Sequence, residues 1–327
     1  MLVKSGATDV LITNNIAPQK ASQLALLAKN NPKITFGVLV DSEQVVDAIQ
    51  EAVGKIATQE KLEQQPKLRV LVEIECGMDR CGVAAGSDAM VSLVRSVLRA
   101  PNLNWGGLQV YAGNLGQVRS TAIRHAAVHA DDGPISAARR SLARLERDGI
   151  KSLPCVTGGG TGTNMMDLHA GIFTELQAGS YLFMDGNYSN NEEGYTSFKQ
   201  ALYVQSTVIS SDEKSGKRII DAGTKAIDIL YGKPQVTNLF DKELCSKLSN
   251  VNYTEGGCEH GILRNVPDGV LKVGDTVQLL PSDLYSTVNR HACFVGVRVG
   301  IRGKIVERID EIDGRYPELQ TRTKSCL

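Results

Sequence analysis

The first half of the chain alternates between short β-branched or apolar runs and longer segments with helical periodicity. A repeat of strand, helix and strand is typical of parallel β/α units, which build either a barrel or a doubly wound sheet. The run from Leu68 to Glu75 is nearly continuous in apolar character, as buried parallel strands are. We predict strands at 9–12, 33–40, 68–75, 108–111, 153–157 and 175–184, and helices at 17–31, 87–99 and 120–149.

The alternation ends at a polar, turn-rich segment over residues 187–194. Beyond it, short β-rich segments are separated by Gly, Asp and Lys, a pattern that favours an antiparallel β domain. We therefore predict an α/β domain over residues 1–190 and a mainly antiparallel β domain over residues 191–327. The strands expected in the second domain lie at 201–210, 218–221, 274–281, 293–299 and 304–309.

The charge balance excludes several classes of partner. The 327 residues carry 36 Lys and Arg against 36 Asp and Glu, which gives a formal net charge of +0. This balance argues against a protein that binds nucleic acid or an anionic membrane through an overall positive charge. No stretch reaches the roughly 20 apolar residues of a membrane span, and no signal peptide is visible at the start. Seven cysteines without a paired framework predict reduced thiols, and hence a cytoplasmic protein.

A glycine-rich segment, Thr-Gly-Gly-Gly-Thr-Gly-Thr over residues 157–163, directly follows a predicted strand. Adjacent glycines let backbone N–H groups point at one anion, and late loops of a β/α barrel are the usual phosphate site. The alternative is a flexible turn. The segment lacks the Lys-Ser/Thr of a P-loop, and no G-x-G-x-x-G opens a first βαβ unit. The pattern therefore does not indicate a nucleotide as the ligand that carries the phosphate.

Two further residues end predicted barrel strands. Arg80 lies between glycines after strand 68–75, where a barrel places its catalytic face, although a surface arginine in a turn fits equally. Tyr111 ends the next strand and suits either ring stacking on a planar ligand or core packing.

Possible metal ligands are few and weakly patterned. Cys76 and Cys81 form a lone C-x4-C, a poor zinc signal. His291 and Cys293 share one face of a strand, because residues i and i+2 point the same way. We interpret His125 and His129, one helical turn apart, as a structural pair.

Together these motifs resemble the D-threonine aldolase / D-serine dehydratase-like family. That family is similar to bacterial alanine racemase, a fold type III pyridoxal-phosphate enzyme with a TIM-type (β/α) barrel, a following β domain and a dimeric assembly. The resemblance rests on the order of segments 72–83, 107–111, 157–163, 175–185, 221–226, 259–261 and 281–289.

The resemblance implies a cofactor site and a reaction. Arg80 would face the phenolic oxygen of pyridoxal 5'-phosphate, and Tyr111 would lie beside its ring. The reaction would be a D-threonine aldolase-like retro-aldol cleavage of a D-3-hydroxy amino acid to glycine and an aldehyde. The alternative is a D-serine or 3-hydroxyaspartate dehydratase, which releases ammonia, and the shared motifs do not separate the two. The phosphate would be held by Gly158, Gly159, Gly160, Thr161, Gly162, Gly179, Ser180 and Tyr181.

The sequence departs from the family in two places. It contains no Pro-His-x-Lys segment, which carries the family's cofactor-binding lysine, so we assign no catalytic lysine and expect a barrel incomplete at its N-terminus. A non-catalytic relative is therefore a further alternative. The family's divalent metal, zinc or manganese, would be bound where this chain has Asp283 and Tyr285, with His291 and Cys293 eight positions later. Asp283, His291 and Cys293 are the candidate ligands.

Overall fold

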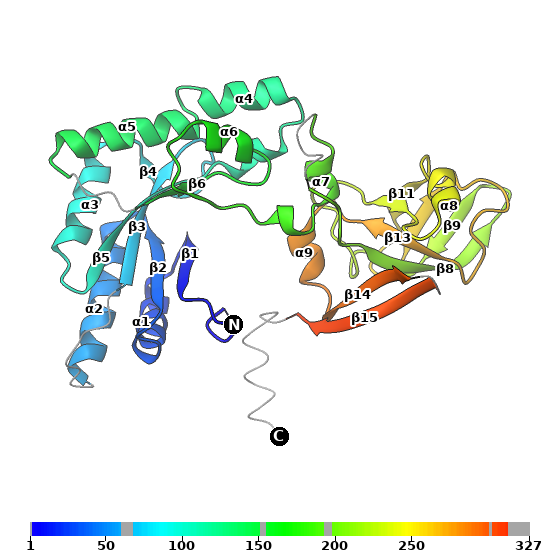
Figure 1. The fold of residues 1–327 in the computed structure, drawn as a ribbon, viewed down its shortest axis with the longest axis horizontal. Coiled ribbons are helices and arrows are strands. Elements are labelled where there is room, and N and C mark those ends of the chain that lie inside the picture. Colours follow the sequence, from blue (N-terminus) through cyan, green and yellow to red (C-terminus); the bar gives the residue numbers. More distant parts are fainter. Residues whose placement is uncertain (1, 60–67, 151–154, 193–197, 301–302, 313–327) are drawn as a thin grey trace. The chain divides into compact units, whose positions relative to one another are not determined.

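The computed structural model describes residues 2–59, 68–150, 155–192, 198–300 and 303–312 (Figure 1). The chain divides into two compact units, Met1–Gly179 and Ser180–Leu327. None of the helices among the described residues has the length and apolar character needed to cross a bilayer.

Within its described part, the first unit is built on a seven-stranded parallel sheet. The strand order β1-β2-β3-β5-β6-β7 follows the chain, and β4 pairs with the end of β3. A doubly wound sheet reverses direction at a switch point, whereas this order continues in one direction as in a barrel. The strands are β1 (Asp9–Asn15), β2 (Thr35–Val40), β3 (Leu68–Glu75), β4 (Val83–Ala84), β5 (Leu103–Val110), β6 (Val156–Gly158) and β7 (Glu175–Leu176).

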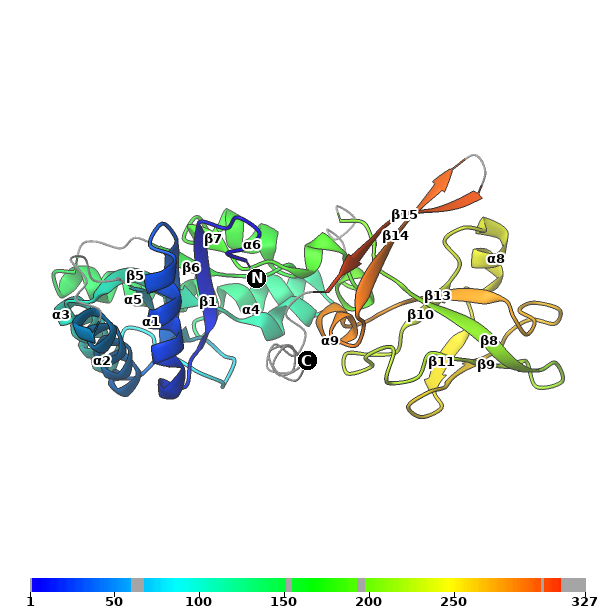
Figure 2. The ribbon, with the colours of Figure 1, turned by 90° about the horizontal axis from the view of Figure 1, so that it is seen from below.

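Amphipathic helices cover this sheet (Figures 1 and 2). Helix α3, for example, starts where the Ser87 side chain accepts the N–H of Met90, and it packs Val91 and Val94 toward β3 and β5. The parallel half-barrel confirms the predicted barrel class. The helices are α1 (Ala21–Asn30), α2 (Glu43–Gln59), α3 (Asp88–Arg99), α4 (Thr121–His129), α5 (Pro134–Arg147) and α6 (Asn164–His169).

Two predictions for the first unit were wrong in detail. The single helix expected over 120–149 is two helices, because Pro134 occupies the first position of α5 and lacks the N–H that a continuous helix needs. The strand expected over 175–184 ends at Leu176, and a 3₁₀ turn follows at Ser180–Leu182, in which Tyr181 and Leu182 are exposed. The strand expected at 153–157 lies partly outside the described residues. Strand β6 begins at Val156, so the two last residues of the predicted strand lie in it.

The second unit contains a six-stranded antiparallel sheet among the described residues, as predicted. Its core gathers buried side chains such as Tyr253, Leu263 and Val277. Three strands of only three or four residues escaped prediction, since so short a run gives little periodicity. The strands are β8 (Val204–Asp212), β9 (Lys217–Ile220), β10 (Gln235–Thr237), β11 (Asn252–Glu255), β12 (Gly261–Arg264) and β13 (Thr276–Leu280); the helices are α7 (Gly186–Ser189), α8 (Lys242–Lys247) and α9 (Leu284–Val288).

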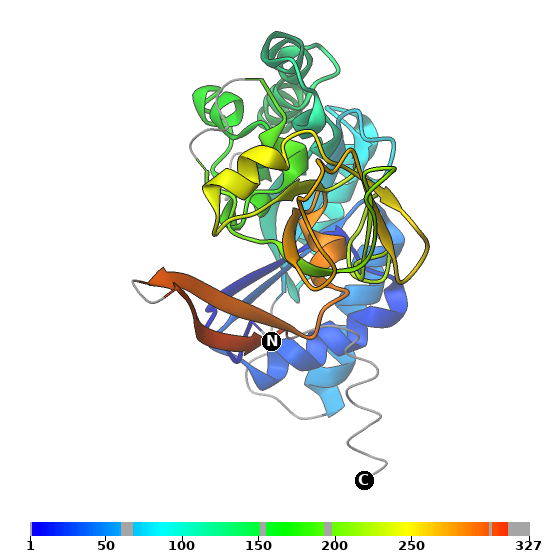
Figure 3. The same ribbon diagram turned by 90° about the vertical axis from the view of Figure 1, so that its right-hand side faces the viewer.

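Strands β14 (Cys293–Gly300) and β15 (Gly303–Glu311) form a separate two-stranded ribbon in this unit (Figure 3). Its Phe294 ring stacks on Phe183 with a centroid distance of 5.6 Å. Val295 pairs with Ile309 across the ribbon, and both side chains are more than half exposed. The ribbon therefore presents an apolar stripe to its surroundings.

Candidate functional site

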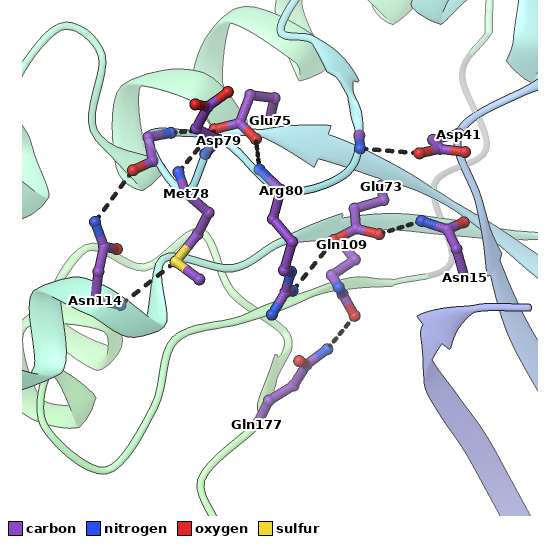
Figure 4. A network of polar contacts seen from close by, with 12 residues as sticks. Asn15, Asp41, Glu73, Glu75, Met78, Asp79, Arg80, Gln109, Asn114 and Gln177 are labelled. Carbon is purple, nitrogen blue, oxygen red and sulfur yellow. Dashed lines mark hydrogen bonds and ion pairs between the residues drawn. The ribbon is translucent and has the colours of Figure 1, made fainter. Parts of the chain in front are cut away.

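The turn that follows β3 is built around the carboxylate of Glu75 (Figure 4). This carboxylate accepts the backbone N–H groups of Gly77, Met78, Asp79 and Arg80 over 2.6–3.4 Å. Burial alone would raise the pKa of Glu75, but these four N–H groups together lower it. The left-handed backbone at Gly77 and Asp79 lets the N–H groups converge, which fixes the position from which Arg80 projects.

Two other groups hold the same turn. The side-chain amide of Asn114 donates to the carbonyl of Gly77 at 3.1 Å, and the backbone N–H of Gly82 donates to Asp41 at 3.2 Å. The turn is thus tied both to the segment after β5 and to the segment after β2 (Figure 4).

The side chain of Arg80 meets a buried acid. Its Nη2 lies 3.5 Å from Oε1 of Glu73, while Oε2 of Glu73 accepts the side-chain amide of Asn15 at 2.6 Å. Burial raises the pKa of the Glu73 carboxyl, although the charge and hydrogen bond of Arg80 act against this. The Arg80 side chain itself keeps 43% of its surface exposed, so it can also contact a ligand.

Polar side chains continue from Glu73 across neighbouring strands. Gln177 donates to Oε1 of Gln109 at 2.7 Å and to Oγ1 of Thr157 at 3.1 Å, and Thr157 donates to Glu175. We did not predict this row from the sequence. The available signal was a charged or amide residue inside an otherwise apolar strand, as with Glu73 and Gln109.

Tyr111 lies between Arg80 and the glycine segment. The guanidinium carbon of Arg80 is 5.7 Å from the centroid of the Tyr111 ring. A Cβ atom placed on Gly160 would lie 3.9 Å from the same ring, with no other neighbour within 4 Å. The structure therefore brings together three of the predicted elements: Arg80, Tyr111 and the loop containing Gly160.

The other glycines of this loop are required by close packing. A Cβ atom on Gly158 would collide with the carbonyl of Val110, and one on Gly162 would collide with the backbone of Gly116. Thr161 is buried beside them. The backbone of this loop is therefore tightly packed at Gly158 and Gly162, whereas Gly160 has open space beside the Tyr111 ring.

The remaining predicted phosphate residues lie where the two units join in sequence. Gly179 is the last residue of the first unit. Ser180 is buried in the second unit, where its hydroxyl donates to the hydroxyl of Tyr285 at 3.1 Å. Tyr181 is 41% exposed and its ring lies 5.6 Å from that of Phe198.

The predicted metal residues are engaged in other contacts. Asp283 caps α9 by accepting the N–H groups of Tyr285 and Ser286, and Nε2 of His291 lies 2.7 Å from the carbonyl of Ala226. Cys293 begins β14 and is exposed. In the described part of the chain, no three or more His, Cys, Asp and Glu residues form a group suited to a metal ion. This donor set does not fit a divalent metal.

Two weaker sequence signals also have structural explanations. Burial raises the pKa of the Cys76 thiol to about 12, and no group of three or more metal-binding side chains forms around it among the described residues. The rings of His125 and His129 stack with centroids 4.1 Å apart, and Nδ1 of His129 lies 2.9 Å from the carbonyl of His125.

Fold and site define a class: a parallel β/α half-barrel with Arg80, Tyr111 and a glycine-rich loop at its strand ends, followed in the chain by an antiparallel β domain. Residues 7–187 match the family described as "Alanine racemase, N-terminal domain", and residues 201–297 match a serine dehydratase domain. The chain belongs to the alanine racemase-like family of pyridoxal-phosphate enzymes that includes the D-threonine aldolases. Some members of this family use metal ions.

Individual relatives support this membership. The chain is 34% identical to 3-hydroxy-D-aspartate aldolase of Paracoccus denitrificans (strain Pd 1222) over 91% of its length and 72% of that protein. It is 34% identical to D-threonine aldolase of Arthrobacter sp over 96% of its length and 76% of that protein. The crystal structure of D-threonine aldolase from Filomicrobium marinum is similar with a TM-score of 0.82 and 32% identity, over 96% of this chain and 78% of that one. A D-threo-3-hydroxyaspartate dehydratase of Delftia sp. (strain HT23) is 26% identical.

Proposed function

We propose that this chain binds pyridoxal 5'-phosphate and takes part in the retro-aldol cleavage of D-3-hydroxy amino acids to glycine and an aldehyde. The observation that carries the proposal is the convergence of Arg80, Tyr111 and Gly160 in the first unit. These residues follow β3, β5 and β6, and the carboxyl ends of barrel strands are where catalytic sites form.

The residues fit this cofactor in chemical terms. The loop from Gly158 to Gly162 would bind the phosphate through backbone N–H groups. Arg80 would bind the phenolic oxygen, and the Tyr111 ring would pack beside the pyridine ring. When bound, the cofactor supplies an electron sink for the bond that breaks at the substrate Cα. The protein's own part is to hold Arg80 in place through Glu73 and Glu75.

The substrate class follows from the relatives. Both aldolases are 34% identical to this chain and the dehydratase is 26% identical, which favours carbon–carbon cleavage over loss of water and ammonia. D-threonine would give glycine and acetaldehyde, and 3-hydroxy-D-aspartate would give glycine and glyoxylate. The dehydratase reaction remains the alternative proposal.

A non-catalytic role is the second candidate function. The 327 residues contain no Pro-His-x-Lys segment, and the chain covers 72% and 76% of the two aldolases that it matches. Lys225 of the second unit forms an ion pair with Glu259, and we assign it no catalytic role. A chain without the lysine would bind the cofactor non-covalently and would lack a group to move protons at Cα.

No step is assigned to zinc or manganese. Asp283 uses its carboxylate to cap α9, and Tyr285 holds its hydroxyl against Ser180. The family's metal would need a different arrangement of these residues, with His291 and Cys293 turned toward the same point.

We further propose that the protein is a cytoplasmic homodimer. The cytoplasmic assignment is supported by the six free cysteines among the described residues. The dimer is supported by the apolar stripe of the β14–β15 ribbon, formed by Val295, Val297, Val306 and Ile309. Light scattering on the purified protein would give the molar mass that tests the dimer.

The function is tested with purified protein and added cofactor. Release of glycine and aldehyde from D-threonine or 3-hydroxy-D-aspartate is the expected result, and Arg80→Ala should abolish it. Release of ammonia and a keto acid would instead establish the dehydratase alternative. Cofactor binding without turnover of any of these substrates would support the non-catalytic role.

A further inference from the structure

A buried carboxylate lies directly behind the proposed phosphate loop. Asp167, on α6, is only 1% exposed. The hydroxyl of Thr163 donates to its Oδ2 at 2.6 Å. The same oxygen occupies the space that a Cβ atom of Gly159 would need, and Gly159 has a left-handed φ of +64°. The loop thus folds over Asp167 with no side chain between them.

Asp167 also links the loop to the helix that follows it. The backbone N–H groups of Met166 and Asp167 both donate to the carbonyl of Thr163, at 2.8 and 3.0 Å. Burial raises the pKa of Asp167, while the hydroxyl of Thr163 and the backbone N–H of Gly160 lower it. The carboxylate therefore accepts the Thr163 hydroxyl at one end of the loop and packs against the backbone of Gly159 at the other, which fixes the backbone between them.

We propose that Asp167 is a positioning residue for the cofactor phosphate: it holds the loop from Gly158 to Thr163 in its binding conformation without contacting the phosphate. This inference rests on the proposed binding of pyridoxal 5'-phosphate. A buried acceptor that is removed leaves donors unsatisfied, so the loop must move to find other partners. The phosphate is the part of the cofactor that such a movement affects.

Three variants separate this role from a general effect on folding. Asp167→Ala removes the hydrogen bond from Thr163 and the side-chain oxygens that pack against Gly159. Asp167→Asn keeps both features, because an amide fills the same space beside Gly159 and its nitrogen donates to the Thr163 hydroxyl, which can rotate to accept it. Thr163→Val leaves the carboxylate and removes one bond. Ser141→Ala is the matched control, since Ser141 is also fully buried in the first unit but its hydroxyl has no hydrogen-bond partner among the described residues.

The affinities for pyridoxal 5'-phosphate and for pyridoxal, measured by calorimetry, test the proposal. Asp167→Ala should weaken binding of the phosphorylated form about tenfold and leave pyridoxal within twofold, whereas Asp167→Asn and the control should resemble the wild type. Hydrogen exchange at residues 159–163 of the protein without cofactor should accelerate in Asp167→Ala and Thr163→Val only. If Asp167→Ala is recovered in low yield, hydrogen exchange in Thr163→Val still tests the proposal.

The outcomes distinguish the inference from the proposed function. If the wild type prefers the phosphorylated form but Asp167→Ala shows the same preference, the positioning role is rejected and the proposed function stands. Equal loss of both ligands in Asp167→Ala, or failure of Asp167→Asn to restore binding, also rejects it. A wild type that binds pyridoxal as tightly as the phosphorylated form rejects the phosphate site itself.

Discussion

The guanidinium of Arg80 lies 3.5 Å from the buried carboxylate of Glu73, seven residues earlier in the chain. The two residues belong to one strand and the turn that follows it, so the pair forms within a single β/α unit. Glu75 holds the backbone of the same turn. In the Glu-Ile-Glu sequence at 73–75, the carboxylate of Glu73 thus pairs with the side chain of Arg80, and the carboxylate of Glu75 accepts its backbone N–H.

Replacement of Glu73 by Gln should change how stability depends on pH. Because the folded-state pKa of Glu73 is raised above its ordinary value of 4.5, ionisation opposes folding. The stability of the wild type relative to Glu73→Gln should therefore fall as pH rises from 4.5 through the raised pKa. Thermal unfolding of both proteins between pH 4 and pH 8 measures this. A constant difference across that range would contradict the expected sign.

Glu75→Gln should behave in the opposite way and serves as the matched control. The pKa of Glu75 is lowered, so its stabilising effect is present above the unfolded value of 4.5 and is lost as pH falls through the folded-state pKa. The variant should be destabilised by about 1 kcal/mol at pH 7, since an amide accepts fewer N–H groups than a carboxylate. The same unfolding experiment shows whether the difference in stability between the wild type and Glu75→Gln becomes smaller below pH 4.5.

A pair of glycine substitutions should separate folding from cofactor binding. Gly158→Ala should destabilise the protein by roughly 1–3 kcal/mol, because the new Cβ would collide with the carbonyl of Val110. Gly160→Ala should leave stability nearly unchanged, since its Cβ has space beside Tyr111, yet it should weaken cofactor binding at least about tenfold by filling that space. Denaturant unfolding and calorimetry measure the two effects. Equal stability losses would show that Gly160 is also a packing residue.

Metal removal should have little effect on this protein. Asp283 is committed to the cap of α9, and the described residues form no group of three or more metal-binding side chains. We expect less than one equivalent of zinc or manganese by mass spectrometry, and the same cofactor affinity after chelation. One equivalent of bound metal in the wild type that is lost in Asp283→Asn or His291→Ala would contradict this expectation. Asp283→Asn is chosen because asparagine keeps the helix cap and removes only the charge.

The sequence was informative wherever a local pattern decides the structure. The strand at 68–75, the helix predicted over 87–99 and the glycine segment at 157–163 each follow from neighbouring residues. Prediction was poorer where the pattern was ambiguous. The apolar residues at 181–184 suggested a strand although that segment leaves the sheet after Leu176, and the helix over 120–149 is interrupted at Pro134.

By itself, the sequence determined the parallel β/α units and the order of the two domains through hydrophobic periodicity, and it indicated the barrel and the family through the resemblance that its motif order carries. Only the tertiary structure decided which side chains meet. Gln109 and Gln177 are 68 residues apart, and their contact depends on the register of parallel strands in the sheet. The support of Gly159 by Asp167 likewise depends on the turn that folds α6 back under the loop. Both contacts depend on how the strands, turns and helices pack in three dimensions, and the local sequence pattern does not specify that packing.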